Sequence, residues 1–486
     1  MTVRQLLTKV LFLGLFFLGF NYTLDPDLWW HLAGGRYIAA HGIPFFDVFS
    51  FTKNGQPWVA HEWLGDWIYW QAYAFGGSAA LMFLGALLVL AAFAAVYAAV
   101  VEGKPLTAAC VTVLAAGTAR AIFGWGLRPQ LWTIFFLSVF SGVLFAVRRG
   151  RMNSNRLYLL PVLMLVWVNL HGGGYLAGIV LLVVYGLADW IQSRRGSATE
   201  AAVGIFTPQQ RRMVFRAAGL CLLVSLANPQ GARIWAYPFG TLFSSSMRQY
   251  LMEWYSPDFH MTENWFFLAY LVVGLVCFCF KKRPLTLAET LVFTGSLAAA
   301  LMSQRHIPLF AVVAAPIVGG CLDFERHFMQ NEDAARLVPW KKLFHVLILG
   351  AAVAAALLCM LNKAADNPKK IQEQFPVKAV DYLEKNALTK KKIYNAYGWG
   401  GYLIWKEIPV YIDGRADLYG EAFFSRYMEH YFLKPEKDFL KMLDGDGIEV
   451  VLLGSDSAPS RLLSASALWK RGYHDKVADV FVRALR

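Results

Sequence analysis

Two aspartates separated by a single proline are the strongest candidates for chemistry in this sequence. Asp25 and Asp27 flank Pro26 and come directly after the first apolar block of the chain. Two carboxylates held this close could bind a divalent cation on a diphosphate, or one could act as a general base that deprotonates an attacking hydroxyl or amine. The same residues would also suit a turn that ends one helix and caps the next. Their position at the end of an apolar block favours the chemical interpretation.

A second acidic candidate, Glu62, lies between two side chains that could assist it. It is preceded by His61 and followed by Trp63, and His31 comes soon after the aspartate pair. The segment is not the zinc-binding HExxH motif, because position 65 is glycine. A hydrogen-bonded His–Glu pair on a helix explains the motif as well as catalysis does. We therefore treat Glu62 as a secondary catalytic candidate and His31 and His61 as candidate cavity residues.

Arginines beside apolar blocks suggest a site for an anion. Arg128 precedes one block, and Arg305 and His306 separate two blocks that have almost no loop between them. The planar guanidinium group stays charged and can donate two hydrogen bonds to a phosphate. Arginines near helix ends also reach toward lipid headgroups without binding a substrate, and this alternative stays open for Arg128. The sequence predicts that Arg128, Arg305 and His306 bind a lipid-linked phosphate.

Two further polar motifs contain glycines. Asn169 and His171 come just before or at the start of a glycine-rich turn between apolar blocks. The glycines suit a tight hairpin, but they do not explain the two polar residues, which become candidates for a polar cavity. In the C-terminal region, Asp413, Arg415 and Asp417 follow a predicted strand. They form either an internal ion-pair turn or a group that closes the site, so Asp413 and Arg415 are also candidate cavity or acceptor residues.

The large share of apolar residues indicates that membrane-spanning helices position the candidate site residues. Of 486 residues, 57% are hydrophobic and only 16% are charged, whereas soluble chains carry about a quarter charged residues. The apolar residues come in blocks that we interpret as eleven membrane spans. These blocks are 10–22, 79–100, 106–123, 130–147, 157–171, 174–191, 215–227, 265–280, 286–303, 307–322 and 343–361. The sequence therefore predicts an α-helical polytopic membrane protein.

The charge distribution predicts how the chain is oriented. The formal net charge is +13, but the excess lies in short segments between the blocks and not on a basic face, so no nucleic-acid partner is expected. With the N-terminus inside, the inner segments carry nineteen Lys and Arg residues and the outer loops carry seven. The positive-inside bias therefore places the N-terminus in the cytoplasm, and an odd number of spans places residues 363–486 outside.

Two regions outside the blocks are predicted to fold. Residues 23–78 form a first outer loop, in which 28–40 and 59–74 have the amphipathic spacing of helices that lie in the membrane interface. In the C-terminal region, helices are expected at 376–385 and 421–432 and strands at 392–397, 409–413 and 449–454. This alternation is typical of a small α/β domain. We therefore divide the chain into a membrane domain, 1–362, and an extracytoplasmic α/β domain, 363–486.

With these residues in place, the chain resembles the GT-C superfamily of membrane glycosyltransferases, which includes oligosaccharyltransferases, protein mannosyltransferases and aminoarabinose transferases. The resemblance rests on the architecture of residues 1–362 and on an acidic motif directly after the first span, which Asp25 and Asp27 match. The combination of DPDLWWHLAGG with WGGYLIW and IDGRADLYG is similar to a bacterial group of GT-C-like proteins and spans nearly the whole chain. The C-terminal region lacks the WWDYG motif of oligosaccharyltransferases, so recognition of a peptide asparagine is not implied.

The resemblance implies an inverting glycosyltransferase in the inner membrane that contacts membrane lipids. It would move a sugar from a polyprenyl-phosphate donor to a glycan, lipid or protein acceptor at the outer face. Asp25 would be the base, and Asp27 would orient the acceptor or bind a divalent Mg or Mn ion. Two other classes of protein stay open. A lipid or polymer transporter would have paired, broken spans in an inverted repeat, which the sequence lacks; a non-catalytic envelope assembly scaffold could retain most of these residues.

Topology reporters test the predicted orientation. We expect a reporter that is active only outside the cytoplasm to be active when it is fused after Arg486 and inactive when it is inserted between residues 196 and 210, because the inner basic residues resist translocation. The reverse pattern would place the acidic loop in the cytoplasm and would remove the predicted outer site.

Overall fold

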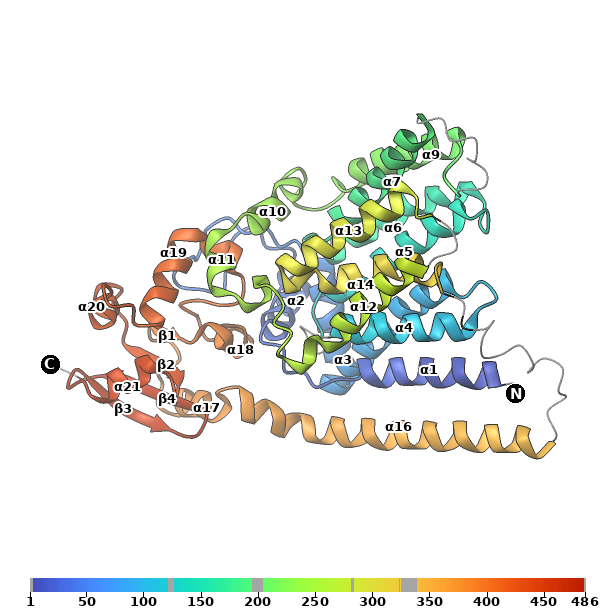
Figure 1. The fold of residues 1–486 in the computed structure, drawn as a ribbon. Coiled ribbons are helices and arrows are strands. Elements are labelled where there is room, and N and C mark those ends of the chain that lie inside the picture. Colours follow the sequence, from blue (N-terminus) through green and yellow to red (C-terminus); the bar gives the residue numbers. More distant parts are fainter. Residues whose placement is uncertain are drawn as a thin grey trace. The chain divides into compact units, whose positions relative to one another are not determined.

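The computed structural model describes residues 3–120, 126–194, 204–280, 284–322, 324 and 339–484, and it is mainly helical with one small sheet (Figure 1). The chain divides into two compact units. The helical unit comprises Met1–Asn21, Met82–Gly231 and Met252–Lys363, and the mixed unit comprises Tyr22–Leu81, Ala232–Leu251 and Ala364–Arg486. The mixed unit therefore joins the first loop, a later loop and the C-terminal region, which are distant in the sequence.

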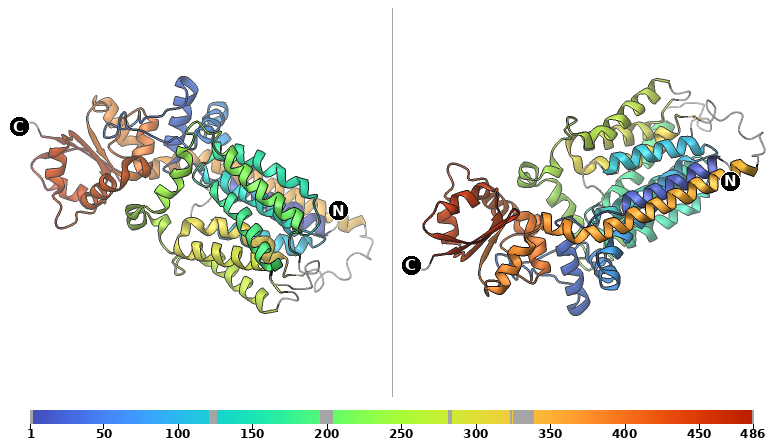
Figure 2. Two further views of the ribbon diagram at one scale, coloured as in Figure 1. Left: turned by 90° about the horizontal axis from the view of Figure 1, so that it is seen from above. Right: turned by 90° about the horizontal axis from the view of Figure 1, so that it is seen from below.

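Each of the eleven predicted apolar blocks contains a helix. Their bounds are α1 Val3–Gly19, α3 Trp63–Val100, α4 Pro105–Arg120, α5 Gln130–Arg148, α6 Leu159–Leu170, α7 Leu176–Arg194, α9 Pro208–Val224, α12 Trp265–Phe280, α13 Leu287–Met302, α14 Ile307–Gly319 and α16 Pro339–Gln374. Figures 1 and 2 show the helices of the helical unit lying roughly alongside one another. Helix α14 is buried along almost its whole length and contacts α4, α5 and α13, so it forms the centre of this unit.

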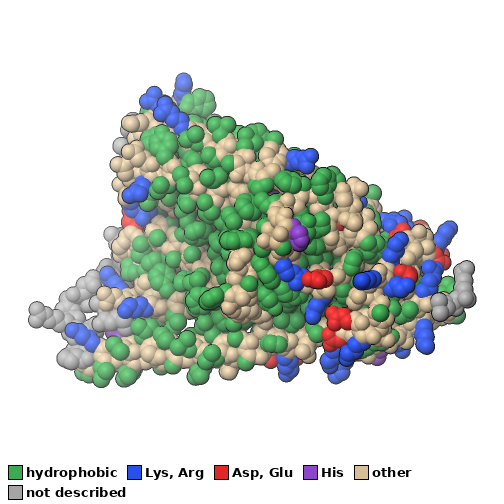
Figure 3. Space-filling view, turned by 180° about the vertical axis from the view of Figure 1, so that it is seen from behind, with side chains coloured by type: hydrophobic (Ala, Val, Ile, Leu, Met, Phe, Trp, Pro, Cys, Tyr) green, Lys and Arg blue, Asp and Glu red, His purple; other side chains and the backbone are tan. Residues whose placement is uncertain are grey.

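The surface of the helical unit indicates an integral membrane protein. Among the residues that the structure describes, five helices are long and apolar enough to cross a membrane: Trp63–Val100, Gln130–Arg148, Leu176–Arg194, Thr262–Cys279 and Lys342–Gln374. Large apolar side chains face outward, since Leu223, Leu275 and Leu358 are 61%, 60% and 63% exposed. Figure 3 shows hydrophobic side chains spread widely over one face of the molecule. Apolar area of this extent suits lipid and not water. The total of eleven spans stays a prediction.

Part of the sequence pattern that predicts orientation lies outside the described residues. Residues 195–203, 281–283, 323 and 325–338 carry several of the inner Lys and Arg residues, and residues 121–123 end one apolar block. The cytoplasmic placement of the N-terminus therefore stays a prediction.

A buried ion pair connects three helices of the helical unit. Arg148, at the end of α5, is 6% exposed and donates to Asp189 on α7 through Nε at 3.0 Å and Nη2 at 2.7 Å. Its Nη2 also donates to Thr286 Oγ1, at the start of α13, at 2.9 Å. Removal of one partner from such a pair leaves a buried, uncompensated charge, which typically costs about 3–5 kcal/mol. The sequence pattern marks Arg148 only as one of the inner basic residues and does not reveal this role.

The mixed unit contains a four-stranded sheet with the strand order β1-β2-β4-β3. The strands are β1 Ile393–Asn395, β2 Val450–Gly454, β3 Trp469–His474 and β4 Ala478–Arg483. Strand β1 pairs parallel to β2, with Ile393 opposite Val450, and β4 pairs antiparallel to both β2 and β3. The helices are α2 Leu28–His41, the first part of α3, α10 Arg233–Leu242, α11 Ser245–Tyr250, α17 Val377–Lys385, α18 Gly400–Trp405, α19 Ala416–Tyr431, α20 Phe439–Gly445 and α21 Ala458–Ser464. The division of the chain at 362/363 stays a prediction.

The two helices predicted in the first loop form with different bounds. Residues 28–40 are helical as α2. The helix predicted at 59–74 begins at Trp63 and continues as α3, which is broken at Gly76 and Gly77, where Gly77 has a φ of +58°. A left-handed conformation of this kind favours glycine, so the break is encoded locally.

The strand predicted at 409–413 is wrong. Val410 makes only a single bridge, to Ser50 of the first loop. The backbone of this segment pairs with the side chain of Asn395 at the end of β1. The Tyr411 N–H donates to Asn395 Oδ1 at 2.9 Å, and Asn395 Nδ2 donates to the Ile412 carbonyl at 2.8 Å. Because a side-chain amide satisfies these backbone groups, the segment needs no ladder of strand hydrogen bonds.

Candidate functional site

The aspartate pair lies at the start of α2, in the mixed unit. Asp27 is the N-cap residue of α2, although its side chain makes no capping hydrogen bond. The Asp27 N–H donates to Asp25 Oδ1 at 2.9 Å, and both side chains are half-buried. This contact fixes the direction of the Asp25 carboxylate. The aspartate pair can therefore form the turn before α2 and also act as a base, because the turn orients the Asp25 carboxylate.

A buried cluster of ionisable side chains lies between α2 and the start of α3. His31 Nδ1 is 2.7 Å from Asp66 Oδ1 and 3.8 Å from Glu62 Oε2. His61 Nε2 is also 3.8 Å from Glu62 Oε2. His31, Glu62 and Asp66 are 2%, 6% and 1% exposed. The structure therefore brings the three predicted candidates His31, His61 and Glu62 together, and it adds Asp66, which the sequence analysis did not single out.

Glu62 is held in its protonated form at neutral pH. Burial raises its pKa to about 8, and His31 opposes this shift. The carboxylates of Asp66, Asp417 and Asp27 raise the pKa further, because a second negative charge nearby is unfavourable. A protonated carboxyl group donates a hydrogen bond and does not accept a proton. If Glu62 takes part in chemistry, its protonation favours the role of proton donor over that of base.

Two glycines allow α2 to approach the start of α3 closely. A Cβ atom on Gly34 would lie 3.2 Å from Asp66 Oδ2. A Cβ atom on Gly35 would collide with the Asp66 carbonyl and would lie 2.7 Å from Trp70 Cβ. A side chain does not fit at position 35 and would crowd the Asp66 carboxylate at position 34, so these glycines help to explain how His31 reaches Asp66.

Three glycines of the C-terminal region pack against the aspartate pair and its surroundings. A Cβ atom on Gly401 would collide with the Pro26 carbonyl oxygen, and one on Gly414 would collide with the Asp27 carboxylate. One on Gly400 would collide with the Ile412 carbonyl oxygen. These glycines therefore serve close packing and do not form a phosphate loop. The motifs that the resemblance connects, DPDLWW, WGGYLIW and IDGRADLYG, are in contact within one unit.

Arg415 fixes the C-terminal region to the first loop. Its Nε and Nη2 donate to the two carboxylate oxygens of Asp413 at 2.8 and 2.7 Å, and its Nη1 lies 2.8 Å from Asp47 Oδ1. The guanidinium lies 4.7 Å from the centre of the Trp58 ring, and the Tyr419 hydroxyl donates to Asp413 Oδ2 at 2.7 Å. Asp413 and Arg415 are 0% and 2% exposed. Of the two predicted alternatives, they form the internal ion pair, and their burial argues against direct contact with an acceptor.

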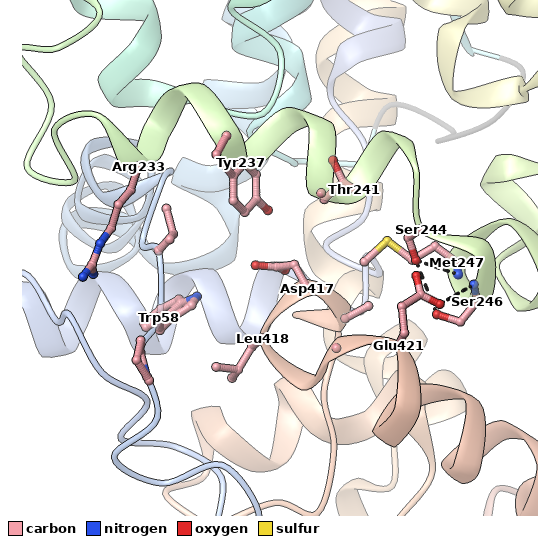
Figure 4. A pocket seen from close by; sticks show the side chains of 16 residues that line it. Trp58, Arg233, Tyr237, Thr241, Ser244, Ser246, Met247, Asp417, Leu418 and Glu421 are labelled. Carbon is pink, nitrogen blue, oxygen red and sulfur yellow. Dashed lines mark hydrogen bonds between the residues drawn. The ribbon is translucent and has the colours of Figure 1, made fainter.

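A pocket of about 400 Å³ lies in the same unit, between α10 and α11 on one side and α19 on the other (Figure 4). Asp417 lines it from α19, and Tyr237 lines it from α10. Burial raises the pKa of Asp417 to about 6, although Arg415 and a hydrogen bond from Tyr237 oppose the shift. The sequence pattern places Asp417 only in the ion-pair turn. The pocket could not be foreseen, because its walls come from three distant segments.

In the helical unit, one glutamate joins two of the predicted phosphate-binding residues. Arg305 Nη1 lies 2.8 Å from Glu253 Oε1, and Arg128 Nη1 lies 3.3 Å from Glu253 Oε2. The Arg305 guanidinium also lies 5.1 Å from the centre of the Trp254 ring. Two guanidinium groups with one carboxylate keep a net positive charge. The arginines are thus brought together as the phosphate hypothesis requires, through Glu253, which the sequence pattern does not connect with them.

His306 contributes no charge to this cluster. Burial, together with the positive charge of Arg305, lowers the pKa of His306 to about 4. The imidazole is therefore neutral at physiological pH. A role for His306 toward phosphate is limited to hydrogen bonding.

Asn169 and His171 take part in contacts between helices of the helical unit. Asn169 Nδ2 donates to the Ala227 carbonyl at 3.0 Å, and its Oδ1 accepts from Asn228 Nδ2 at 3.3 Å. His171 Nδ1 lies 2.6 Å from Thr133 Oγ1. Both residues are buried. These contacts hold α5, α6 and the turn after α9 together, which explains both polar residues without a ligand.

The described residues do not provide the protein ligands that a metal ion needs. Within the described ranges, no three His, Cys, Asp or Glu side chains are grouped so that they could hold a metal ion. The Mg or Mn ion predicted at Asp27 therefore finds no ligand set there, and we derive no chemical step through a metal.

Comparisons with solved structures identify the fold. An oligosaccharyltransferase from Archaeoglobus fulgidus, tethered to an acceptor peptide, is similar with a TM-score of 0.52 and 13% identity, over 93% of this chain and 69% of that one. ArnT from Cupriavidus metallidurans, bound to undecaprenyl phosphate, is similar with a TM-score of 0.51 and 12% identity, over 99% and 97% of the two chains.

A third structure, the arabinofuranosyltransferase AftD from Mycobacteria, has a TM-score of 0.52 and 12% identity, over 99% of this chain and 42% of that one. No family model matches the sequence, and no curated protein matches it. All three structural neighbours are GT-C glycosyltransferases, so the chain has a GT-C-like fold. The predicted resemblance is confirmed at the level of the fold.

The raised pKa of Glu62 predicts how the stability of the protein depends on pH. The folded state keeps the Glu62 proton up to about pH 8, whereas the unfolded state releases it near 4.5, so the free energy of unfolding falls as the pH rises between these values. Glu62→Gln should remove this contribution and flatten the decline. Melting temperatures of the detergent-solubilised protein at pH 5, 6.5 and 8.5 test it, with the exposed Glu436 changed to Gln as the control. Equal pH profiles for wild type and Glu62→Gln would contradict the buried, protonated state.

Proposed function

We propose that the chain is a membrane glycosyltransferase that moves a sugar from a polyprenyl-phosphate donor to an acceptor at the outer face of the inner membrane. The observation that supports this most is the aspartate pair after α1, which is packed against the glycines of the C-terminal region on a GT-C-like fold. In this proposal the N-terminus is cytoplasmic, and residues 363–486 belong to an extracytoplasmic domain.

Asp25 is the base in this mechanism. Its carboxylate takes a proton from an acceptor hydroxyl or amine, and the oxygen or nitrogen then bonds to the anomeric carbon of the donor. The bond between that carbon and the phosphate oxygen breaks, and its electron pair leaves with the polyprenyl phosphate. Attack from the face opposite the phosphate inverts the anomeric centre. The Asp27 N–H, which donates to Asp25 Oδ1, orients the base.

Arg305 and Arg128 bind the phosphate of the donor. The leaving phosphate gains negative charge in the transition state, and positioned guanidinium groups stabilise such charge. Glu253 holds both arginines in place, at 2.8 and 3.3 Å, and its single charge does not neutralise them. ArnT, which shares this fold, was solved with undecaprenyl phosphate, and this supports the same lipid class here.

The base is tested by Asp25→Asn. A base that removes a proton in the transition state contributes about 10²–10⁴-fold, so cells that carry this variant in place of the wild-type chain should lose the glycan product. The product is measured by mass spectrometry of envelope glycans and glycolipids. Asp27→Asn should have a smaller effect, because it keeps the backbone N–H that orients Asp25.

Asp456→Asn is the matched control, because Asp456 is exposed and lies in the same unit. If Asp25→Asn is folded and inserted, yet keeps the wild-type product, the aspartate pair is not the catalytic centre. A non-catalytic scaffold would then be the better interpretation.

The phosphate site is tested by substitution of Arg305. Charge-assisted hydrogen bonds contribute about 1.5–3 kcal/mol each, so Arg305→Ala should bind undecaprenyl phosphate at least about tenfold more weakly. Arg305→Lys keeps the charge but loses the planar fork, so its affinity should also fall. Native mass spectrometry of the purified protein measures the retained lipid, with the exposed Arg156 changed to Ala as the control. Unchanged retention in both Arg305 variants would remove the phosphate role.

A further inference from the structure

The pocket in the mixed unit has an acidic wall and a wall of hydroxyl groups. Asp417 and Glu421 come from α19, and Tyr237, Thr241 and Ser244 come from α10 and the residues after it. In Figure 4, the Asp417 carboxylate points from α19 toward the side chain of Tyr237 on α10, with which it shares a hydrogen bond. The pocket volume of about 400 Å³ falls in the range of about 300–1,000 Å³ that is typical of small-molecule sites.

Glu421 stabilises the far end of the pocket. Its Oε2 accepts hydrogen bonds from the Ser246 N–H at 2.9 Å and from Ser245 Oγ at 3.0 Å. Burial acts against ionisation, but hydrogen bonds from the serines, including Ser244, lower the pKa of Glu421 to about 2. The group is therefore ionised under all physiological conditions, and it joins α11 to α19. This contact holds the two walls of the pocket at a fixed separation.

The charges and the apolar residues of the pocket together select a class of ligand. Arg233 is the single cation among the lining residues and stands against two carboxylates, which disfavours an anionic ligand such as a phosphate. Trp58, Met247 and Leu418 supply apolar surface. A sugar ring offers hydroxyl groups at its edges, which carboxylates and hydroxyls can bind, and C–H groups on its faces, which suit apolar and aromatic side chains.

The pocket also adjoins the buried carboxylate cluster. The charge of Asp417 contributes to the raised pKa of Glu62, and so does the charge of Asp27. The ring of Tyr237 lies 4.0 Å from the ring of His61, centre to centre. A ligand held by Asp417 and Tyr237 is therefore next to the buried cluster that contains Glu62 and His61.

We propose that this pocket binds a saccharide and that the acceptor of the transfer is a glycan, held through its hydroxyl groups by Asp417 and Tyr237. The proposal names the acceptor class and so rests on the proposed function. Binding of the saccharide itself requires neither the donor nor the transfer step.

Saturation-transfer NMR on the purified full-length chain in detergent tests the proposal. The probes are methyl β-D-glucopyranoside, methyl β-D-galactopyranoside and methyl α-D-mannopyranoside, and lysine methyl ester represents a cationic, non-saccharide ligand. We expect at least one glycoside to bind. Asp417→Asn should weaken this binding at least tenfold, because the neutral amide accepts hydrogen bonds less strongly than a carboxylate.

Gly240 and Gly445 provide a variant that blocks the pocket and a control variant that does not. A Cβ atom on Gly240, which lines the pocket, meets no atom within 4 Å, so Gly240→Leu can fill the cavity without a backbone clash. Gly445, in α20 of the same unit, has equally open surroundings and lies outside the pocket. Gly240→Leu should abolish binding, and Gly445→Leu should leave it unchanged. If Gly240→Leu does not fold, Asp417→Asn decides the question.

The proposal is overturned if no glycoside binds, if binding survives both Gly240→Leu and Asp417→Asn, or if only lysine methyl ester binds. Its failure is separate from failure of the proposed function. The Asp25→Asn variant should bind the glycoside as the wild type does. If the pocket does not bind saccharides, Asp25→Asn should still lose the glycan product.

Discussion

The buried guanidinium of Arg415 is the interaction on which the mixed unit depends. It is shared between Asp413, two residues away, and Asp47, far earlier in the chain, and it packs on Trp58. Removal of such a group would leave buried carboxylates without a counter-charge, which is among the costliest changes that a protein can undergo. Because α19 begins directly after Arg415, the same contact also sets the position of Asp417 and of the pocket that it lines. The acidic first loop and the C-terminal region are in this way one structural unit and not two neighbouring ones.

A group of acidic side chains within the mixed unit determines the chemistry that is available at the candidate site. Burial raises the pKa of Glu62 and of Asp417, and the charges of Asp27 and Asp417 raise that of Glu62 further. Protonation of Glu62 reduces the repulsion between these acidic groups, and Asp25 stays oriented by the turn. Shifts of this kind are concentrated at functional sites.

The sequence predicts most of the helices, because an apolar block has few other ways to satisfy its backbone than to form a helix. The resemblance groups the three motifs that meet at the aspartate pair, but only the structure shows that their glycines pack closely there. The sequence-based prediction fails at 409–413, where the side chain of Asn395 takes the hydrogen bonds that a neighbouring strand would supply. It also misses Glu253 between the arginines and the pocket at Asp417, because both arise from segments that only the folded chain brings together.

A structure of the purified protein with undecaprenyl phosphate would show whether this fold binds a lipid phosphate at Arg305 and Arg128. We expect density for the phosphate on the guanidinium groups of Arg305 and Arg128, with Glu253 displaced from at least one of them. A saturated sample in which both arginines remain on Glu253, and in which the lipid phosphate lies elsewhere or is absent, would contradict this expectation.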